Sequence, residues 1–206
     1  MPKKRRVNKR KPKKRILILC EGGETEPNYF NGLKRDKAQR NRLAALRIEV
    51  YDSDKSTGKE LVIEAKHLKT IARQEKNPYD DVWVVIDRDG YTKHPHAFDQ
   101  ARANKIKIAF SSISFEFWIL LHYAYTTRHF STADDLIRHL KSRYMTDYDK
   151  TDDNYSKLKD LTPDAIQHAE RAREYFQNDL DRGTRIYELN PYTDVDVLVD
   201  KLLKLD

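Results

Sequence analysis

Two short apolar runs, each ending on carboxylates, constrain the fold of this chain most strongly. Residues 16–20 (ILILC) lead directly to Glu21, and residues 82–86 (VWVVI) lead to Asp87 and Asp89. A short apolar run followed by an acid, a glycine and a helix-like pattern is typical of a buried parallel strand that delivers the acid to its carboxyl end. Ligands bind at this edge of open α/β sheets. We therefore expect the three carboxylates around one small volume.

Three carboxylates in one small volume repel each other unless a cation neutralises them, and Mg²⁺ prefers hard oxygen ligands. The pattern therefore predicts a site for Mg²⁺ or Mn²⁺ in which Glu21, Asp87 and Asp89 are both the catalytic and the metal-binding residues. A metal held there polarises a phosphate and activates water, which is the usual strategy for phosphodiester cleavage. Glu21 is a candidate metal ligand in this site. The alternative is that all three are ordinary surface carboxylates at strand ends.

Two further acids are candidate metal ligands, Glu116 and Glu24. Glu116 lies between two phenylalanines and ahead of an apolar helical pattern, where a buried carboxylate needs a partner. It is either a metal ligand or an acid that stabilises the helix dipole. Glu24 is close to Glu21 in the sequence and would widen the acidic site. Glu26 is a weaker candidate, because an acid in the first turn of a helix also serves the helix start.

Other residue types point less clearly to a site. His94 and His96 form an H-x-H pair, but histidines in a loop beside a proline are more often surface residues. Cys20, at the end of an apolar run, is expected to be a small core residue rather than a nucleophile. Gly22 and Gly23 match neither a P-loop nor a dinucleotide-binding motif, so ATP binding is not indicated.

The excess positive charge lies at the amino terminus. The chain has 40 basic and 33 acidic residues, and residues 1–15 hold ten of the basic residues and no acid, which leaves 30 basic and 33 acidic residues in the remainder. Such a tail is attracted to phosphate backbones without sequence preference, or else only keeps the chain in solution. Tyr144, Tyr148 and Tyr155 are interleaved with basic residues and either stack bases or pack in the core. The candidate nucleic-acid-binding residues are Lys3, Lys4, Arg5, Arg6, Lys9, Arg10, Lys11, Lys13, Lys14 and Arg15.

Strand-like and helix-like patterns alternate along the first part of the chain. Strands are predicted at residues 16–20, 46–51, 81–86 and 105–110, and helices from about residue 27 and at residues 59–74, 97–104 and 115–125. This β-α-β order indicates an α/β fold with a parallel sheet flanked by helices. Beyond about residue 130 the pattern is helical, at residues 133–144, 163–178 and 195–205. We therefore expect a disordered basic tail (residues 1–15), an α/β core (16–128) and a C-terminal helical extension packed on that core (129–206).

Residues 20–30 (CEGGETEPNYF) resemble the opening motif C-E-G-x-x-T-E-P-N-Y-F of RloB-like proteins, which are related to abortive-infection proteins of the AbiL type. Residues 112–122 (SISFEFWILLH) resemble the later pattern S-N-P-x-F-E-x-W-L-L-L-H, with Ile-Ser in place of Asn-Pro. Residues 190–193 (NPYT), followed by LVDKLL, resemble the family ending. The resemblance covers nearly the whole chain after residue 15.

This resemblance implies a fold similar to the Toprim domain of topoisomerases, DnaG-type primases and OLD-family nucleases. The Toprim signature is a Glu after the first strand and a D-x-D after a later one, and Glu21 and residues 87–89 match it. For Glu21 the resemblance implies a role as general acid/base, as the alternative to metal ligation. The implied protein is a Mg²⁺-dependent nuclease that acts on DNA or RNA in prokaryotic phage defence. An ATPase encoded nearby is the implied partner.

Two other functions remain open. Residues 84–92 (VVIDRDGYT) resemble the D-x-D-G-T opening of HAD phosphatases, but there the nucleophile usually follows the first strand and here a Glu-bearing strand precedes it. The second alternative is a non-catalytic nucleic-acid-binding or adaptor subunit with a degenerate Toprim core. The presence of Glu21, Asp87 and Asp89 argues against a degenerate core. The single cysteine fits a reducing cytoplasm, and the chain shows neither a signal peptide nor a run of about 20 apolar residues. A cytoplasmic protein without a membrane span is therefore expected.

Overall fold

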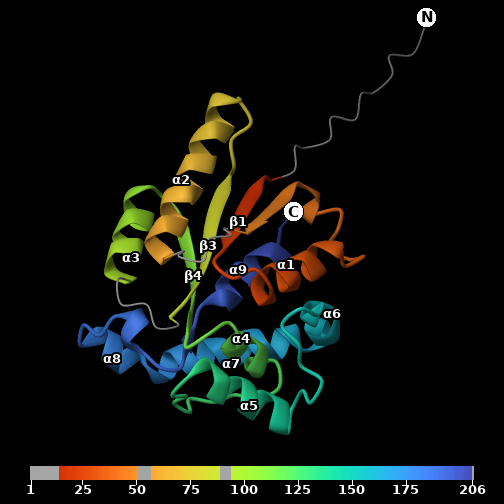
Figure 1. The fold of residues 1–206 in the computed structure, drawn as a ribbon, viewed down its shortest axis with the longest axis vertical. Helices are drawn as coiled ribbons and strands as arrows, with labels where there is room; N and C mark the ends of the chain where they lie inside the picture. The colour runs from red at the N-terminus through yellow and green to blue at the C-terminus, as the bar shows by residue number, and fades with distance from the viewer. Residues whose placement is uncertain (1–13, 51–56, 89–93, 206) are drawn as a thin grey trace, which may run out of the picture.

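The computed structural model of the chain describes residues 14–50, 57–88 and 94–205, and a five-stranded sheet lies at its centre (Figure 1). The strand order is β2-β1-β3-β4-β5, in which the first four strands run parallel and β5 runs antiparallel to β4. The strands are β1 (Ile16–Cys20), β2 (Leu46–Val50), β3 (Asp81–Asp87), β4 (Lys107–Ser112) and β5 (Tyr192–Thr193). This α/β arrangement confirms the predicted fold class and is consistent with a Toprim-like sheet.

Strand β1 is buried along its whole length because it pairs with β2 on one side and β3 on the other, with helices on both faces of the sheet. Its side chains alternate between two hydrophobic clusters. Ile16 and Ile18 belong to one cluster, while Leu17 and Leu19 belong to the other. A strand buried on both faces needs apolar residues at every position, which explains the continuous apolar run.

Helices α2 (Gly58–Gln74) and α3 (His94–Ala103) cover one face of the sheet (Figure 1). Helix α2 begins with a capping box, in which the Thr57 hydroxyl accepts from the Glu60 amide and the Glu60 carboxylate accepts from the Thr57 amide. Gly58 sits close to β3, since a Cβ there would lie 3.2 Å from Ile86 side-chain atoms. A small residue at this position therefore lets the helix start approach the sheet.

The larger helical layer covers the other face and includes both the start and the end of the chain. Helix α1 (Thr25–Arg35) and helix α4 (Glu116–Leu121) contribute its aromatic core, in which Tyr29, Phe30 and Trp118 are fully buried. The remaining helices of this layer are α5 (Ala133–Arg143), α6 (Asn154–Leu158), α7 (Thr162–Tyr175) and α9 (Val195–Leu203), whereas α8 (Gln177–Asp181) packs through Leu180 against the cluster on the α2–α3 face. Short 3-10 turns lie at Leu43–Ala45, Lys159–Leu161 and Ile186–Glu188. Residues before and after position 128 share one continuous core on this face.

Several predicted elements differ from the structure, among them the helix predicted at residues 115–125, which is the shorter α4 and ends at Leu121. Pro95 was expected in a loop, but it lies in the first turn of α3, where a proline costs no hydrogen bond. The strand predicted from residue 105 starts at Lys107, because Lys105 has a φ of 52° where the chain turns out of α3. Strand β5 lies in a segment that was expected to be wholly helical, and two residues are too few for a periodic signal. Within the described ranges, no helix combines the length and apolar character needed to cross a lipid bilayer.

Candidate active site

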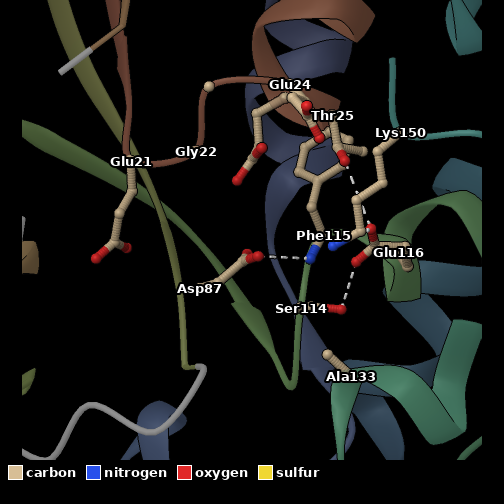
Figure 2. Close-up of a pocket in the computed structure, with 12 residues that line it drawn as sticks. Glu21, Gly22, Glu24, Thr25, Asp87, Ser114, Phe115, Glu116, Ala133 and Lys150 are labelled. Carbon is tan, nitrogen blue, oxygen red and sulfur yellow. Dashed lines mark hydrogen bonds and ion pairs between the residues drawn. The ribbon is translucent and has the colours of Figure 1, made fainter. Parts of the chain in front are cut away.

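A pocket of about 380 Å³ lies at the carboxyl edge of the parallel strands, and five of its twelve described lining residues are acids (Figure 2). Its lining comes from the loop after β1, the end of β3, the start of α4 and two positions beyond residue 128. We call it the acidic pocket. Its described lining residues are Glu21, Gly22, Gly23, Glu24, Thr25, Glu26, Asp87, Ser114, Phe115, Glu116, Ala133 and Lys150.

Glu21 and Asp87 reach this pocket because their strands are parallel neighbours. Cys20 pairs with Val85 in the sheet, and both acids follow just beyond this pair. The Glu21 amide donates to the Val85 carbonyl oxygen at 3.2 Å, which extends the pairing by one residue. The structure therefore brings two of the three sequence-predicted catalytic residues to one edge, while Asp89 lies outside the described residues.

Asp87 lies at the end of β3 and lines the acidic pocket. Its Oδ2 atom accepts a hydrogen bond from the Phe115 amide at 3.0 Å. Its Oδ1 atom is buried and has no hydrogen-bond partner among the residues that the structure describes. Burial, followed by the negative charges of Glu26 and Glu116, raises the pKa of Asp87 well above its ordinary value. A cation near Oδ1 would offset this cost.

Glu116 begins α4 and is only 2% exposed. Its Oε2 atom accepts from the Ser114 hydroxyl at 2.5 Å, and its Oε1 atom accepts from the Tyr148 hydroxyl at 2.8 Å and the Thr25 hydroxyl at 3.5 Å. The Lys150 ammonium lies 3.6 Å from Oε1. A buried carboxylate at this position was expected to need a partner, and the structure supplies three hydroxyl groups and one ammonium group. Both readings of Glu116, metal ligand or helix-start acid, remain compatible with this position.

Glu26, in the first turn of α1, is a buried acid that also lines the acidic pocket. It is 5% exposed, and burial raises its pKa to about 7, with the Glu116 charge adding and a backbone hydrogen bond opposing. A Cβ at Gly22 would lie 2.6 Å from the Glu26 Oε2 atom, so the glycine allows this close approach. A signal existed in the helical spacing: Glu26 shares the face of Tyr29 and Phe30, three and four positions on, and both are fully buried.

The other predicted metal ligand, Glu24, is exposed and lines the same pocket. Glu21, Glu24, Asp87 and Glu116 therefore belong to one pocket. In the three described ranges, no group of at least three His, Cys, Asp or Glu side chains is arranged closely enough to hold a metal ion. The acids that line the pocket offer carboxylate oxygens, and Asp87 Oδ1 is a buried one without a hydrogen-bond partner among the described residues.

Lys150 was not singled out by sequence patterns, yet it lines the acidic pocket. It lies between α5 and α6, far along the chain from Glu21 and Asp87. No local motif marks it, because its place follows from the tertiary packing of the later helices. Tyr148, two residues earlier, is buried and bonded to Glu116, which favours the core role among its two predicted alternatives.

Most of the predicted nucleic-acid-binding tail, from Lys3 to Lys13, lies outside the described residues. Arg15 is held at the opposite edge of the sheet from the acidic pocket. Its amide donates to Asp80 Oδ2 at 2.7 Å, and its guanidinium lies 4.5 Å from the centre of the Tyr79 ring. Arg15 therefore has a structural contact at the amino end of β1.

The remaining candidates have mainly packing roles. His94, expected at the surface, is instead 3% exposed, with its ring 5.3 Å from that of Phe110 between centroids, while His96 is exposed as expected. Cys20 is buried and burial raises its pKa, which confirms the prediction of a core residue. Tyr155 is also buried, and Tyr144 stacks on Tyr123 with a centroid distance of 5.7 Å.

Comparisons with known proteins identify the family. A search of curated proteins finds no match. A family model described as "RloB-like protein" matches residues 16–202. The matched range contains all five strands and every described residue of the acidic pocket. The chain therefore belongs to the RloB-like protein family.

Proposed function

We propose that this protein is a Toprim-like, metal-dependent nuclease that hydrolyses phosphodiester bonds in DNA or RNA. The observation that carries the proposal is the environment of Asp87. Its carboxylate is buried, surrounded by other acids, and has one oxygen without a hydrogen-bond partner in the described structure. Such an arrangement costs stability, and proteins retain costly acid clusters mainly at functional sites.

Mg²⁺ or Mn²⁺ is the proposed cofactor, because the available donors are carboxylate oxygens. The residues proposed to hold it are Glu21, Asp87 and Asp89, together with Glu116 and Glu24. A bound divalent cation would polarise the scissile phosphate and lower the pKa of a water molecule. Burial has already removed much of the competing water from Asp87, which strengthens its attraction to a cation.

The residues of the chain itself would orient this chemistry. The Phe115 amide fixes one oxygen of Asp87, which leaves the other to face a ligand. The Ser114 and Tyr148 hydroxyls fix both oxygens of Glu116. Glu21, which follows β1 and precedes two glycines, is the proposed general acid/base or metal ligand.

The proposed setting is prokaryotic phage defence, in the cytoplasm, with an ATPase partner encoded nearby. A freely active nuclease would harm its own cell, so we expect the isolated chain to be weak or silent. The acidic character of the chain beyond the tail supports this expectation, because a net negative body disfavours unaided approach to phosphates.

The decisive experiment is a cleavage assay. Purified protein is incubated with plasmid DNA and with total tRNA, in Mg²⁺, Mn²⁺ or EDTA, with and without the neighbouring ATPase. The proposal expects divalent-dependent cleavage that is lost in Asp87→Asn and kept in Asp164→Asn, an exposed aspartate on α7. Nucleic-acid binding without cleavage under every condition would favour the adaptor alternative.

A further inference from the structure

Lys150 brings a positive charge into a pocket that is otherwise acidic. Among the described residues that line the pocket, it alone carries a cationic side chain. Its ammonium lies 3.6 Å from Glu116 Oε1, and its side chain is 47% exposed, compared with 3% for that of Glu116. Figure 2 shows it entering the pocket beside Glu116 and opposite Asp87. The ammonium is therefore open to a ligand in the pocket.

Glu116 does not depend on Lys150 for hydrogen bonding. The hydroxyls of Ser114, Tyr148 and Thr25 already donate to its two oxygens. The separation of 3.6 Å is an ion-pair contact rather than a hydrogen bond of normal length. The three donor hydrogens of the ammonium are therefore not committed to Glu116.

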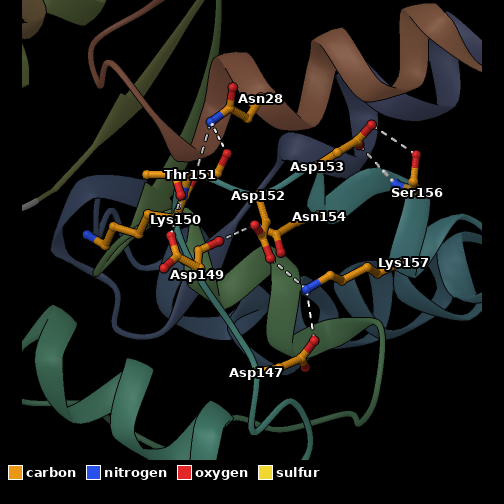
Figure 3. A network of polar contacts seen from close by, with 10 residues as sticks. All are labelled: Asn28, Asp147, Asp149, Lys150, Thr151, Asp152, Asp153, Asn154, Ser156 and Lys157. Atoms are coloured by element: carbon orange, nitrogen blue, oxygen red, sulfur yellow. Dashed lines mark hydrogen bonds and ion pairs between the residues drawn. The ribbon is translucent and has the colours of Figure 1, made fainter.

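The backbone around Lys150 is held in place by other residues (Figure 3). The Asn28 side-chain amide, on α1, donates to the carbonyl oxygens of Lys150 at 3.3 Å and Thr151 at 3.1 Å. The Asn154 side-chain amide donates to the Asp149 carbonyl oxygen at 2.8 Å. The loop is therefore attached to the same helix that begins at the acidic pocket, and this attachment fixes where the Lys150 side chain starts.

Lys157, in the same region, is a lysine with a structural role and serves as a comparison for Lys150. Its ammonium bridges Asp147 at 2.9 Å and Asp152 at 2.7 Å. In Figure 3 the Lys157 side chain points into this network, while the Lys150 side chain points away from it. The network is thus complete without the Lys150 ammonium, so loop stability does not explain its position.

We propose that the Lys150 ammonium contacts a non-bridging oxygen of the substrate phosphodiester in the acidic pocket. This inference rests on the proposed function, since it assumes a phosphodiester substrate. A pocket lined by acids repels a phosphate, and a positioned ammonium offsets part of this repulsion as a point charge. Lys150 would thereby make a composite site, in which acids from the α/β core face a substrate-contacting cation from the later part of the chain.

The test measures binding rather than turnover. Affinity for a short labelled DNA duplex and a short labelled RNA strand is followed by fluorescence anisotropy over a salt series, with Ca²⁺ as the divalent ion. Lys150→Met should weaken binding about fivefold and reduce the logarithmic salt slope by about 0.9 on the duplex or 0.7 on a single strand, the value for one lost phosphate contact. Lys150→Arg should restore the slope. Lys157→Met is the matched control and should leave the slope unchanged.

The outcomes separate this inference from the proposed function. Unchanged binding and slope in Lys150→Met would overturn the phosphate contact, even if the protein proves to be a nuclease. An equal loss in Lys157→Met would also overturn it, because loop integrity would then explain both. A reduced slope in a protein that never cleaves would support the contact and refute the nuclease. Thermal denaturation of each variant shows that the compared proteins are folded.

Discussion

The Phe115 amide donates a hydrogen bond to Asp87 Oδ2 at 3.0 Å, which joins the end of β3 to the start of α4. This contact makes the position of Asp87 depend on the turn that also carries Glu116. The two acids come from segments that are well separated in sequence, and one backbone hydrogen bond sets them on the same pocket. The fold therefore holds two negatively charged side chains near each other, and the effect of their repulsion on stability is measurable.

Asp87→Asn should abolish any metal-dependent cleavage while stabilising the metal-free protein, by on the order of 1 kcal/mol. The substitution removes a buried carboxyl group whose pKa is raised by burial and by neighbouring acids. The amide oxygen of Asn can still accept the hydrogen bond from the Phe115 amide. Thermal denaturation in EDTA measures the stability, and the cleavage assay measures activity. A less stable variant would mean that the Asp87 carboxylate stabilises the fold without a metal.

Arg173→Met should destabilise the protein by about 3 kcal/mol. The Arg173 guanidinium makes two hydrogen bonds to Asp196, at 2.5 and 2.7 Å, and joins α7 to α9. Asp196 is only 2% exposed, so the substitution leaves a buried carboxylate without its counter-ion. Urea denaturation measures the loss. A cost below about 1 kcal/mol, typical of surface ion pairs, would contradict the assignment.

Asp194→Asn should change how stability depends on pH. Burial raises the pKa of Asp194 from 3.8 to about 7, while the hydrogen bond from the Phe110 amide at 2.6 Å opposes the rise. The unfolded chain therefore ionises first, and this residue lowers the stability of the folded state as the pH rises from about 4 to 7. Because the side chain keeps some exposure, we expect a loss on the order of 2 kcal/mol.

The measurement for Asp194 compares urea denaturation of wild type and Asp194→Asn at about pH 3.5, below the ordinary pKa of the carboxyl group, and at about pH 8. The variant should gain stability relative to wild type at the higher pH and show little difference at the lower pH. Asp164→Asn, at an exposed position, is the control for a general charge effect. Parallel pH profiles for Asp194→Asn and wild type would exclude ionisation of this residue as the cause.

Deleting residues 2–13 should weaken nucleic-acid binding and flatten its salt dependence without changing stability. The deletion removes eight basic residues, and each phosphate contact contributes about 0.9 to the logarithmic salt slope on duplex DNA. Deleting residues 2–15 should in addition lower stability, because it removes the contacts of Arg15 with Tyr79 and Asp80. Equal salt slopes before and after the shorter deletion would assign binding to the remainder of the chain.

The predictable parts of the fold are those in which the hydrophobic pattern of the sequence matches the burial of the side chains in the structure. The runs before Glu21 and Asp87 are apolar at every position because β1 and β3 are buried on both faces, so strand type, direction and the shared edge followed from the sequence. The convergence of Glu24 and Glu116 on the same pocket followed from the same reasoning and from the family resemblance.

The parts that were not predictable depend on contacts between distant segments. Lys150 and Tyr148 reach Glu116 through the packing of later helices, and no spacing in the sequence encodes that approach. His94 looked like a surface residue beside a proline, but packing against Phe110 buries it. The burial of Glu26 was not predicted for a different reason, because an acid in the first turn of a helix usually stabilises the helix dipole at the surface.

The division of the pocket between early and late parts of the chain has a consequence for biosynthesis. A chain that ended at α4 would contain Glu116 and its donors Ser114 and Thr25, but would lack Tyr148 and Lys150. The acids would then have fewer hydrogen-bond donors, which disfavours their burial. We therefore expect the pocket to be completed only after the segment through Lys150 has been synthesised and has folded.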